Sequence, residues 1–126
     1  ERLMHHPAVD RVRFPTAHGC DPRGIIGRQM SGPGTMISID LIGGYEAARR
    51  VMALVGIFTP AVSLGSTDSL IQHPAGLTHR IVGEDAQAEG DIGPSLLRLS
   101  VGLEDVEDLW ADLAGALEAV IPMAAK

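Results

Sequence analysis

Several residue types are scarce in this chain, and each shortage excludes a class of protein. The 126 residues include one cysteine, Cys20, so no disulfide can form within the chain, as is usual in a reducing cytoplasm. No apolar run reaches about 18 residues, so no transmembrane helix is expected, and the first residues have no signal-peptide layout. Positive charge is also scarce. A net charge of −6 without a basic cluster disfavours nucleic acids and anionic membranes as partners.

Two kinds of chemistry lack the residues that they need. The only lysine is the final residue, Lys126, so a reaction that requires a buried lysine amine cannot be carried out by this chain alone. The five histidines and Cys20 match no compact zinc-binding motif, and no glycine-rich phosphate-binding motif is present. We therefore predict no metal site.

The residues that are abundant are apolar ones. Their share is 45%, with 15 glycines in addition, and the chain starts without methionine. The length allows one domain, residues 1–126. We expect this domain to be a fragment of a longer polypeptide, whose absent parts cover its excess of apolar surface.

Hydrophobic periodicity predicts an α+β domain. Strands are expected over 11–14, 35–41, 57–62 and 95–101, and helices over 45–55 and from Asp105 to Pro122. The pair Asp21-Pro22 is typical of a helix start and predicts a short helix that ends at Met30. Residues 63–90 show no strong period and are expected to form a long loop. This order of elements indicates a small, mostly antiparallel sheet with helices packed on one face.

Arg98 is a candidate binding residue because it interrupts the apolar predicted strand 95–101. A guanidinium keeps its charge and offers a rigid fork of donors, so partial burial requires an anionic partner. That partner could be a protein carboxylate, or a carboxylate or phosphate of a ligand. The alternative is that Arg98 lies on the solvent-exposed face of an edge strand.

A second candidate is the hydroxyl-rich run Ser63-Leu-Gly-Ser-Thr-Asp-Ser69, which directly follows a predicted strand. Small residues around Gly65 would let the backbone approach a ligand closely. An ordinary turn after a strand has the same composition, so the run alone does not establish a binding site.

Two long blocks and two shorter ones resemble a single enzyme family. They are Ala61-Val-Ser-Leu-Gly-Ser-Thr-Asp-Ser-Leu-Ile-Gln-His-Pro-Ala-Gly-Leu-Thr-His79, Leu97-Arg-Leu-Ser-Val-Gly-Leu-Glu-Asp-Val-Glu-Asp-Leu109, His6-Pro-Ala-Val-Asp-Arg-Val12 and Arg28-Gln-Met30. Together they resemble the C-terminal domain of the Cys/Met-metabolism pyridoxal-phosphate enzymes, which include cystathionine γ-synthase, cystathionine γ-lyase, methionine γ-lyase and the O-acylhomoserine sulfhydrylases. The resemblance covers nearly the whole chain.

This resemblance implies the C-terminal domain of a fold-type I enzyme that carries out γ-elimination or γ-replacement on methionine, cystathionine or an O-acylhomoserine. Arg98 would bind the substrate α-carboxylate and Ser63 would lie beside it, with Val62 and Leu64 as further substrate-binding residues. The cofactor, pyridoxal 5'-phosphate, would be held by an upstream domain that the chain lacks. The resemblance therefore implies no catalytic or cofactor-binding residue in this chain, and a cytoplasmic homotetramer for the intact enzyme.

Val62 bears on the choice of substrate. Members of the family that handle cystathionine often carry a glutamate at this position, which can contact the distal amino group of a long substrate, and valine cannot. Val62 thus resembles the methionine γ-lyase branch, whereas Ser66-Thr67-Asp68 departs from the commoner Gly-Val-Glu. The alternative function is that of a stand-alone carboxylate-binding or scaffold module without catalysis.

Overall fold

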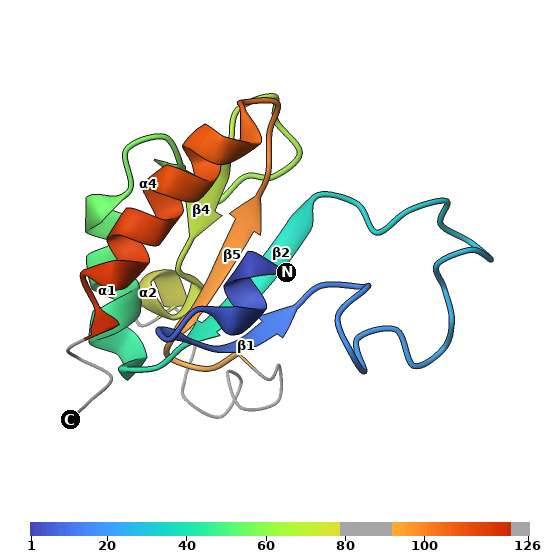
Figure 1. The fold of residues 1–126 in the computed structure, drawn as a ribbon, viewed down its shortest axis with the longest axis horizontal. Coiled ribbons are helices and arrows are strands. Elements are labelled where there is room, and N and C mark those ends of the chain that lie inside the picture. The colour runs from blue at the N-terminus through green and yellow to red at the C-terminus, as the bar shows by residue number, and fades with distance from the viewer. Residues whose placement is uncertain (79–91, 122–126) are drawn as a thin grey trace.

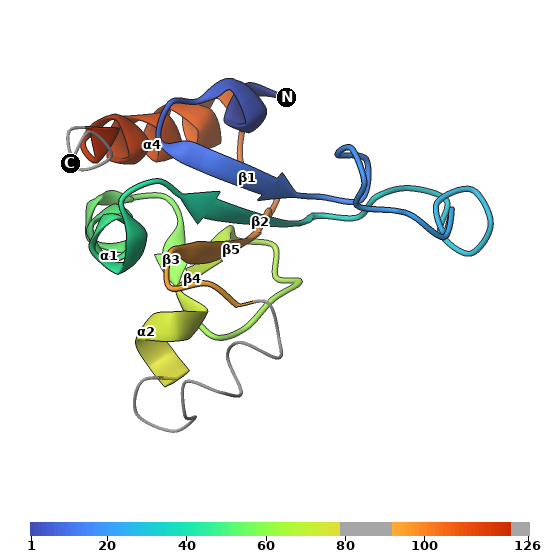
Figure 2. The same cartoon turned by 90° about the horizontal axis from the view of Figure 1, so that it is seen from below.

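The computed structural model describes residues 1–78 and 92–121. A five-stranded sheet in the order β1-β2-β5-β4-β3 forms its centre, as Figures 1 and 2 show. The strands are β1 (Val9–Arg13), β2 (Met36–Leu41), β3 (Thr59–Pro60), β4 (Leu70–Gln72) and β5 (Leu96–Ser100). The helices are the 3₁₀ helix η1 (Arg2–His5), α1 (Gly44–Leu54), α2 (Pro74–Thr78) and α4 (Val106–Glu118).

The pairing of the strands confirms the predicted fold class. The pairs β1–β2, β2–β5 and β5–β4 are antiparallel, and only β3–β4 is parallel. The strand that carries Arg98, β5, lies in the middle of the sheet with a partner on each side. The alternative that placed Arg98 on an edge strand is therefore wrong.

One face of the sheet is covered by α1 and α4 and contains the hydrophobic core. Ile39 lies opposite Leu97 and Ile71 lies opposite Leu99 in the strand register, and all four side chains are buried. The helices contribute Ala47, Ala48 and Val51 from α1, and Leu109, Leu113, Ala116 and Leu117 from α4. Because successive strand residues point to opposite faces, Leu96, Arg98 and Ser100 lie on the face away from this core.

The predicted helix that starts at Asp21-Pro22 does not form. Gly24 and Gly27 adopt positive φ angles of 59° and 85°, which an α-helix does not allow. The carboxylate of Asp21 accepts hydrogen bonds from the backbone N–H groups of Ile25 and Ile26, at 2.8 and 3.0 Å, so the residue closes a turn instead. Residues 14–35 form the long extension that projects from β1 and β2 in Figure 1.

The prediction for residues 57–90 is wrong in two places. The expected strand over 57–62 shrinks to the two residues of β3, which includes Pro60 and lies at the edge of the sheet, where proline is tolerated. The expected loop over 63–90 contains β4 and α2. These elements have three and five residues, which is too short for a periodic signal. The remainder, 79–91, lies outside the described residues.

Helix α4 begins as predicted and also fixes the approach to β3. The Asp105 carboxylate accepts hydrogen bonds from the N–H groups of Glu107 and Asp108, as expected of an N-cap. Two turns later, Asp112 accepts three backbone hydrogen bonds, of 2.7 to 3.2 Å, from residues 56–58. The chain therefore enters β3 at a position set by α4.

Gly102 allows the end of β5 to pack closely against the segment that leads into β4. A Cβ atom at this position would lie 2.6 Å from the carbonyl carbon of Asp68 and nearer still to the carbonyl oxygen of Thr67. Neither backbone atom can move like the end of a flexible side chain. The N–H of Leu103 donates to that same carbonyl of Thr67, at 2.8 Å, so any side chain at position 102 would disturb this contact.

We expect Gly102→Ala to lower the free energy of unfolding of the chain by about 1–3 kcal/mol, since it overpacks a site bounded by backbone. Urea unfolding followed by the fluorescence of Trp110, the single tryptophan, measures this change. Gly115→Ala is the matched control, because Gly115 lies inside α4 with open space around it. The control should raise stability by roughly 0.5–1 kcal/mol. Equal stability of the two variants would contradict the close packing at Gly102.

Candidate functional site

The guanidinium of Arg98 lies against the backbone that leads out of β3. Its Nη2 donates to the carbonyl oxygens of Val62 and Ser63, at 3.2 and 2.9 Å. Its Nε is buried and has no hydrogen-bond partner. Within residues 1–78 and 92–121, no carboxylate forms an ion pair with it. The structure thus brings Arg98 and Ser63 together, through the side chain of one and the backbone of the other.

A second unpartnered polar atom lies on the neighbouring strand. Gln72 is the cross-strand partner of Arg98 in the β4–β5 register, and its Oε1 is buried without a hydrogen-bond partner in the described part of the chain. Buried polar atoms in folded proteins are nearly always paired. The unpaired donor on Arg98 and the unpaired acceptor on Gln72 therefore indicate that this part of the sheet lacks a polar partner.

The residues around Arg98 combine one charge with apolar surface. Val62 and Leu64 are 68% and 56% exposed, and Ser63 is exposed as well. Large apolar side chains are rarely exposed together without a function. Arg98, Val62 and Leu64 can therefore contact a molecule with an anionic group and an apolar part.

Polar side chains beyond Arg98 hold the segment that contains Ser63, and the sequence analysis missed them. Ser69, fully buried, donates through its N–H and its hydroxyl to the two carboxylate oxygens of Glu104, both at 2.7 Å. Ser100 accepts a hydrogen bond from the N–H of Gly65, at 2.8 Å. Glu104 directly precedes the N-cap Asp105 and is the first of several acidic residues typical of a helix start. Its spacing of two from Gly102 and four from Ser100 continues the strand period and was the available signal.

The hydrogen bonds from Ser69 also affect the ionisation of Glu104. The backbone N–H and then the hydroxyl of Ser69 lower the pKa of the Glu104 carboxyl below its ordinary value, against a smaller opposing effect of desolvation. Hydrogen bonds to the ionised form explain the direction. Glu104 therefore contacts Ser69 as a carboxylate at neutral pH.

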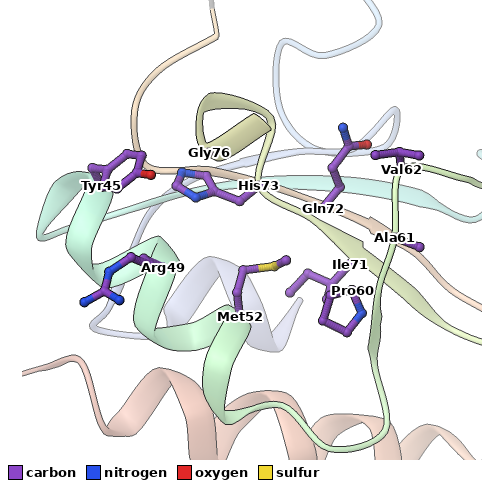
Figure 3. A pocket seen from close by; sticks show the side chains of 10 residues that line it. All are labelled: Tyr45, Arg49, Met52, Pro60, Ala61, Val62, Ile71, Gln72, His73 and Gly76. Atoms are coloured by element: carbon purple, nitrogen blue, oxygen red, sulfur yellow. The ribbon is translucent and has the colours of Figure 1, made fainter. Parts of the chain in front are cut away.

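An apolar cavity of about 380 Å³ lies between α1 and the β3–β4 edge (Figure 3). Its lining residues are Tyr45, Arg49, Met52, Pro60, Ala61, Val62, Ile71, Gln72, His73 and Gly76. Its one arginine, Arg49, forms an ion pair with Glu46. Arg98 does not line this cavity, although its neighbours Val62 and Gln72 do.

The described residues contain neither a metal-binding cluster nor a membrane-spanning helix. In residues 1–78 and 92–121, no group of three or more histidine, cysteine, aspartate or glutamate side chains could hold a metal ion. Over the same ranges, no helix combines the length and the apolar character needed to cross a lipid bilayer.

Comparisons with known proteins agree with the motifs. The chain is 53% identical over 119 residues to an L-methionine gamma-lyase of Brevibacterium sandarakinum, which covers 94% of this chain and 29% of that protein. A solved cystathione gamma lyase of Micromonospora echinospora matches with a TM-score of 0.84 and 42% identity, over 93% of this chain and 30% of that one. A solved cystathionine gamma synthase of Xanthomonas oryzae pv. oryzae, in complex with aminoacrylate and cysteine, has a TM-score of 0.87 and 38% identity, over 97% of this chain and 32% of that one.

The chain therefore spans about three tenths of the length of these relatives. The model of one protein family, described as Cys/Met metabolism PLP-dependent enzyme, matches residues 1–118. This match extends over both long blocks and over every described strand. The fold, the identities and the family model agree, and the chain belongs to the pyridoxal-phosphate-dependent enzymes of cysteine and methionine metabolism.

Proposed function

We propose that residues 1–126 are the C-terminal, substrate-holding domain of an enzyme that acts at the γ-carbon of a sulfur amino acid, and that Arg98 binds the substrate α-carboxylate. One observation carries the proposal. Arg98 is a half-buried cation on a central strand, its Nε has no partner, and no carboxylate pairs with it in the described part of the chain. A guanidinium in such a place calls for an anion.

The two carbonyl contacts orient the guanidinium but leave its charge uncompensated. Nη2 binds the carbonyls of Val62 and Ser63, which are neutral acceptors. The remaining nitrogens of Arg98 make no hydrogen bond to the described residues. A carboxylate bound there would be held in one orientation, and this would fix the direction of the Cα–H bond of an α-amino acid.

The neighbours of Arg98 favour an uncharged substrate side chain. Val62 carries no charge that could receive a distal ammonium group, and Leu64 adds further exposed apolar surface. Methionine, whose thioether side chain is uncharged, fits this environment better than cystathionine. The relatives that are named L-methionine gamma-lyases support the same choice.

The described residues lack the lysine amine to which pyridoxal phosphate, the cofactor of the family, would be attached. The only lysine is Lys126, outside the described ranges, so residues 1–78 and 92–121 offer no lysine amine to the cofactor. We propose that an upstream domain binds it, in a cytoplasmic homotetramer. The supporting facts are the single cysteine of the chain and the share of about three tenths that the chain covers of its relatives.

The second candidate function is a stand-alone carboxylate-binding or scaffold module. It uses the same Arg98 geometry and needs no cofactor domain. The mass of the protein isolated from its source distinguishes the two functions. A polypeptide about three times as long as this chain, yellow from bound pyridoxal phosphate, supports the enzyme.

In the intact enzyme, Arg98→Ala should lower kcat/KM for L-methionine by at least about tenfold. The reason is the loss of a charge-assisted contact worth roughly 1.5–3 kcal/mol. Steady-state kinetics measure this loss. Cofactor content, measured by the cofactor absorbance, should stay unchanged. The control is Arg49→Ala, which removes an arginine that already has Glu46 as a partner. Unchanged kinetics for Arg98→Ala would refute the proposed role.

The chain of 126 residues alone should be inactive toward L-methionine and should not be labelled stoichiometrically by pyridoxal phosphate and borohydride. The described residues contain no lysine, and Lys126 is the last residue of the chain. Mass spectrometry after reduction measures the labelling. A stoichiometric adduct together with turnover of L-methionine would show that the chain needs no further domain.

A further inference from the structure

The segment Val62–Ser69 contains the substrate-holding residues proposed above, yet it has almost no apolar contacts of its own. Every residue from Val62 to Asp68 is exposed, and only Ser69 is buried. Segments with few buried apolar contacts open at low free energy. Its position must therefore depend on polar contacts.

Those contacts come from alternate residues of β5 and its continuation. Arg98 binds the carbonyls of Val62 and Ser63, and Ser100 binds the N–H of Gly65. The last contact in this series is the one between Glu104 and Ser69. Arg98, Ser100 and Glu104, on β5 and its continuation, therefore hold successive residues of the segment in place.

The contact between Glu104 and Ser69 is the most complete of the series. Both carboxylate oxygens accept a hydrogen bond from Ser69, one from its N–H and one from its hydroxyl, each at 2.7 Å. The same hydroxyl accepts from the N–H of Gly102, at 2.8 Å. Three hydrogen bonds therefore meet at Ser69, the residue where the segment joins β4. The carboxylate accepts both Ser69 hydrogen bonds at once, one on each oxygen.

We propose that Glu104 is a positioning residue for the carboxylate site: by fixing Ser69 it holds the Val62 and Ser63 carbonyls where they orient Arg98. This inference rests on the proposed function of Arg98. The hydrogen bonds of the Glu104 carboxylate go to Ser69 and not to Arg98 or Ser63, so Glu104 acts through the segment between them. Loss of Glu104 should weaken capture of the α-carboxylate without removing any group that contacts it.

Glu104→Gln is the sharpest variant, because it keeps the shape of the side chain. The amide keeps an acceptor oxygen for the Ser69 N–H, but it carries no charge, and its NH2 group can meet the Ser69 hydroxyl only as a donor, so both charge-assisted bonds are lost. Glu107→Gln is the matched control. Glu107 lies three residues further along and pairs with Arg2 instead. Ser69→Ala removes the hydroxyl bond from the other side and replaces Glu104→Gln should that variant fail to fold.

The test uses the intact enzyme and L-methionine as the probe. Glu104→Gln should raise KM about tenfold, the effect of losing the charge-assisted hydrogen bonds to Ser69, with kcat changed less than threefold and cofactor content unchanged. Glu107→Gln should match the unmodified enzyme. The decisive measurement is a double-mutant cycle. In an Arg98→Ala background, Glu104→Gln should change KM less than twofold, since the group that it positions is gone.

Two outcomes would overturn the inference. One is an unchanged KM in Glu104→Gln, or in Ser69→Ala where the first variant does not fold. The other is an equal change of KM with and without Arg98, which would indicate a general structural role for Glu104. The proposed function fails separately, through unchanged kinetics of Arg98→Ala alone. A failure of Glu104 to act on Arg98 is thereby distinguished from a failure of Arg98 to bind the carboxylate.

Discussion

The central position of β5 is the constraint on which the rest of the structure depends. The strand is hydrogen-bonded on both sides, to β2 and to β4, and Leu97 and Leu99 bury their side chains beneath α1 and α4. A shift of one residue would exchange the two faces of the strand. The buried leucines therefore fix the register, and Arg98 must emerge on the face away from the helices.

The segment after β3 depends on β5 in turn. It has exposed side chains and little apolar content, so polar contacts with Arg98, Ser100 and Glu104 hold it in place. The candidate site therefore consists of the central strand β5 and of a segment whose position is set by contacts with that strand. The site combines exposed apolar residues with a half-buried charge. The strand β5 supplies the stability that the exposed segment lacks.

Long periodic stretches of the sequence predicted their structures correctly. The strands around Ile39 and Leu97, α1, and α4 with its N-cap Asp105 all agree with the pattern. The errors lie where the pattern is short or is opposed by glycine. Residues 21–30 form turns instead of the expected helix because Gly24 and Gly27 adopt positive φ angles. The short elements β4 and α2 contain too few residues to show a period.

The sequence by itself determined the fold class, the two core helices and the presence of one arginine within an apolar strand, because periodicity and charge are local properties of the chain. Its blocks also identified the family correctly. Only the tertiary structure decided that β5 is central, that Arg98 meets the carbonyls of Val62 and Ser63, and that Glu104 binds Ser69. These contacts join residues about 35 positions apart. They arise from the order of the strands, which no local pattern specifies.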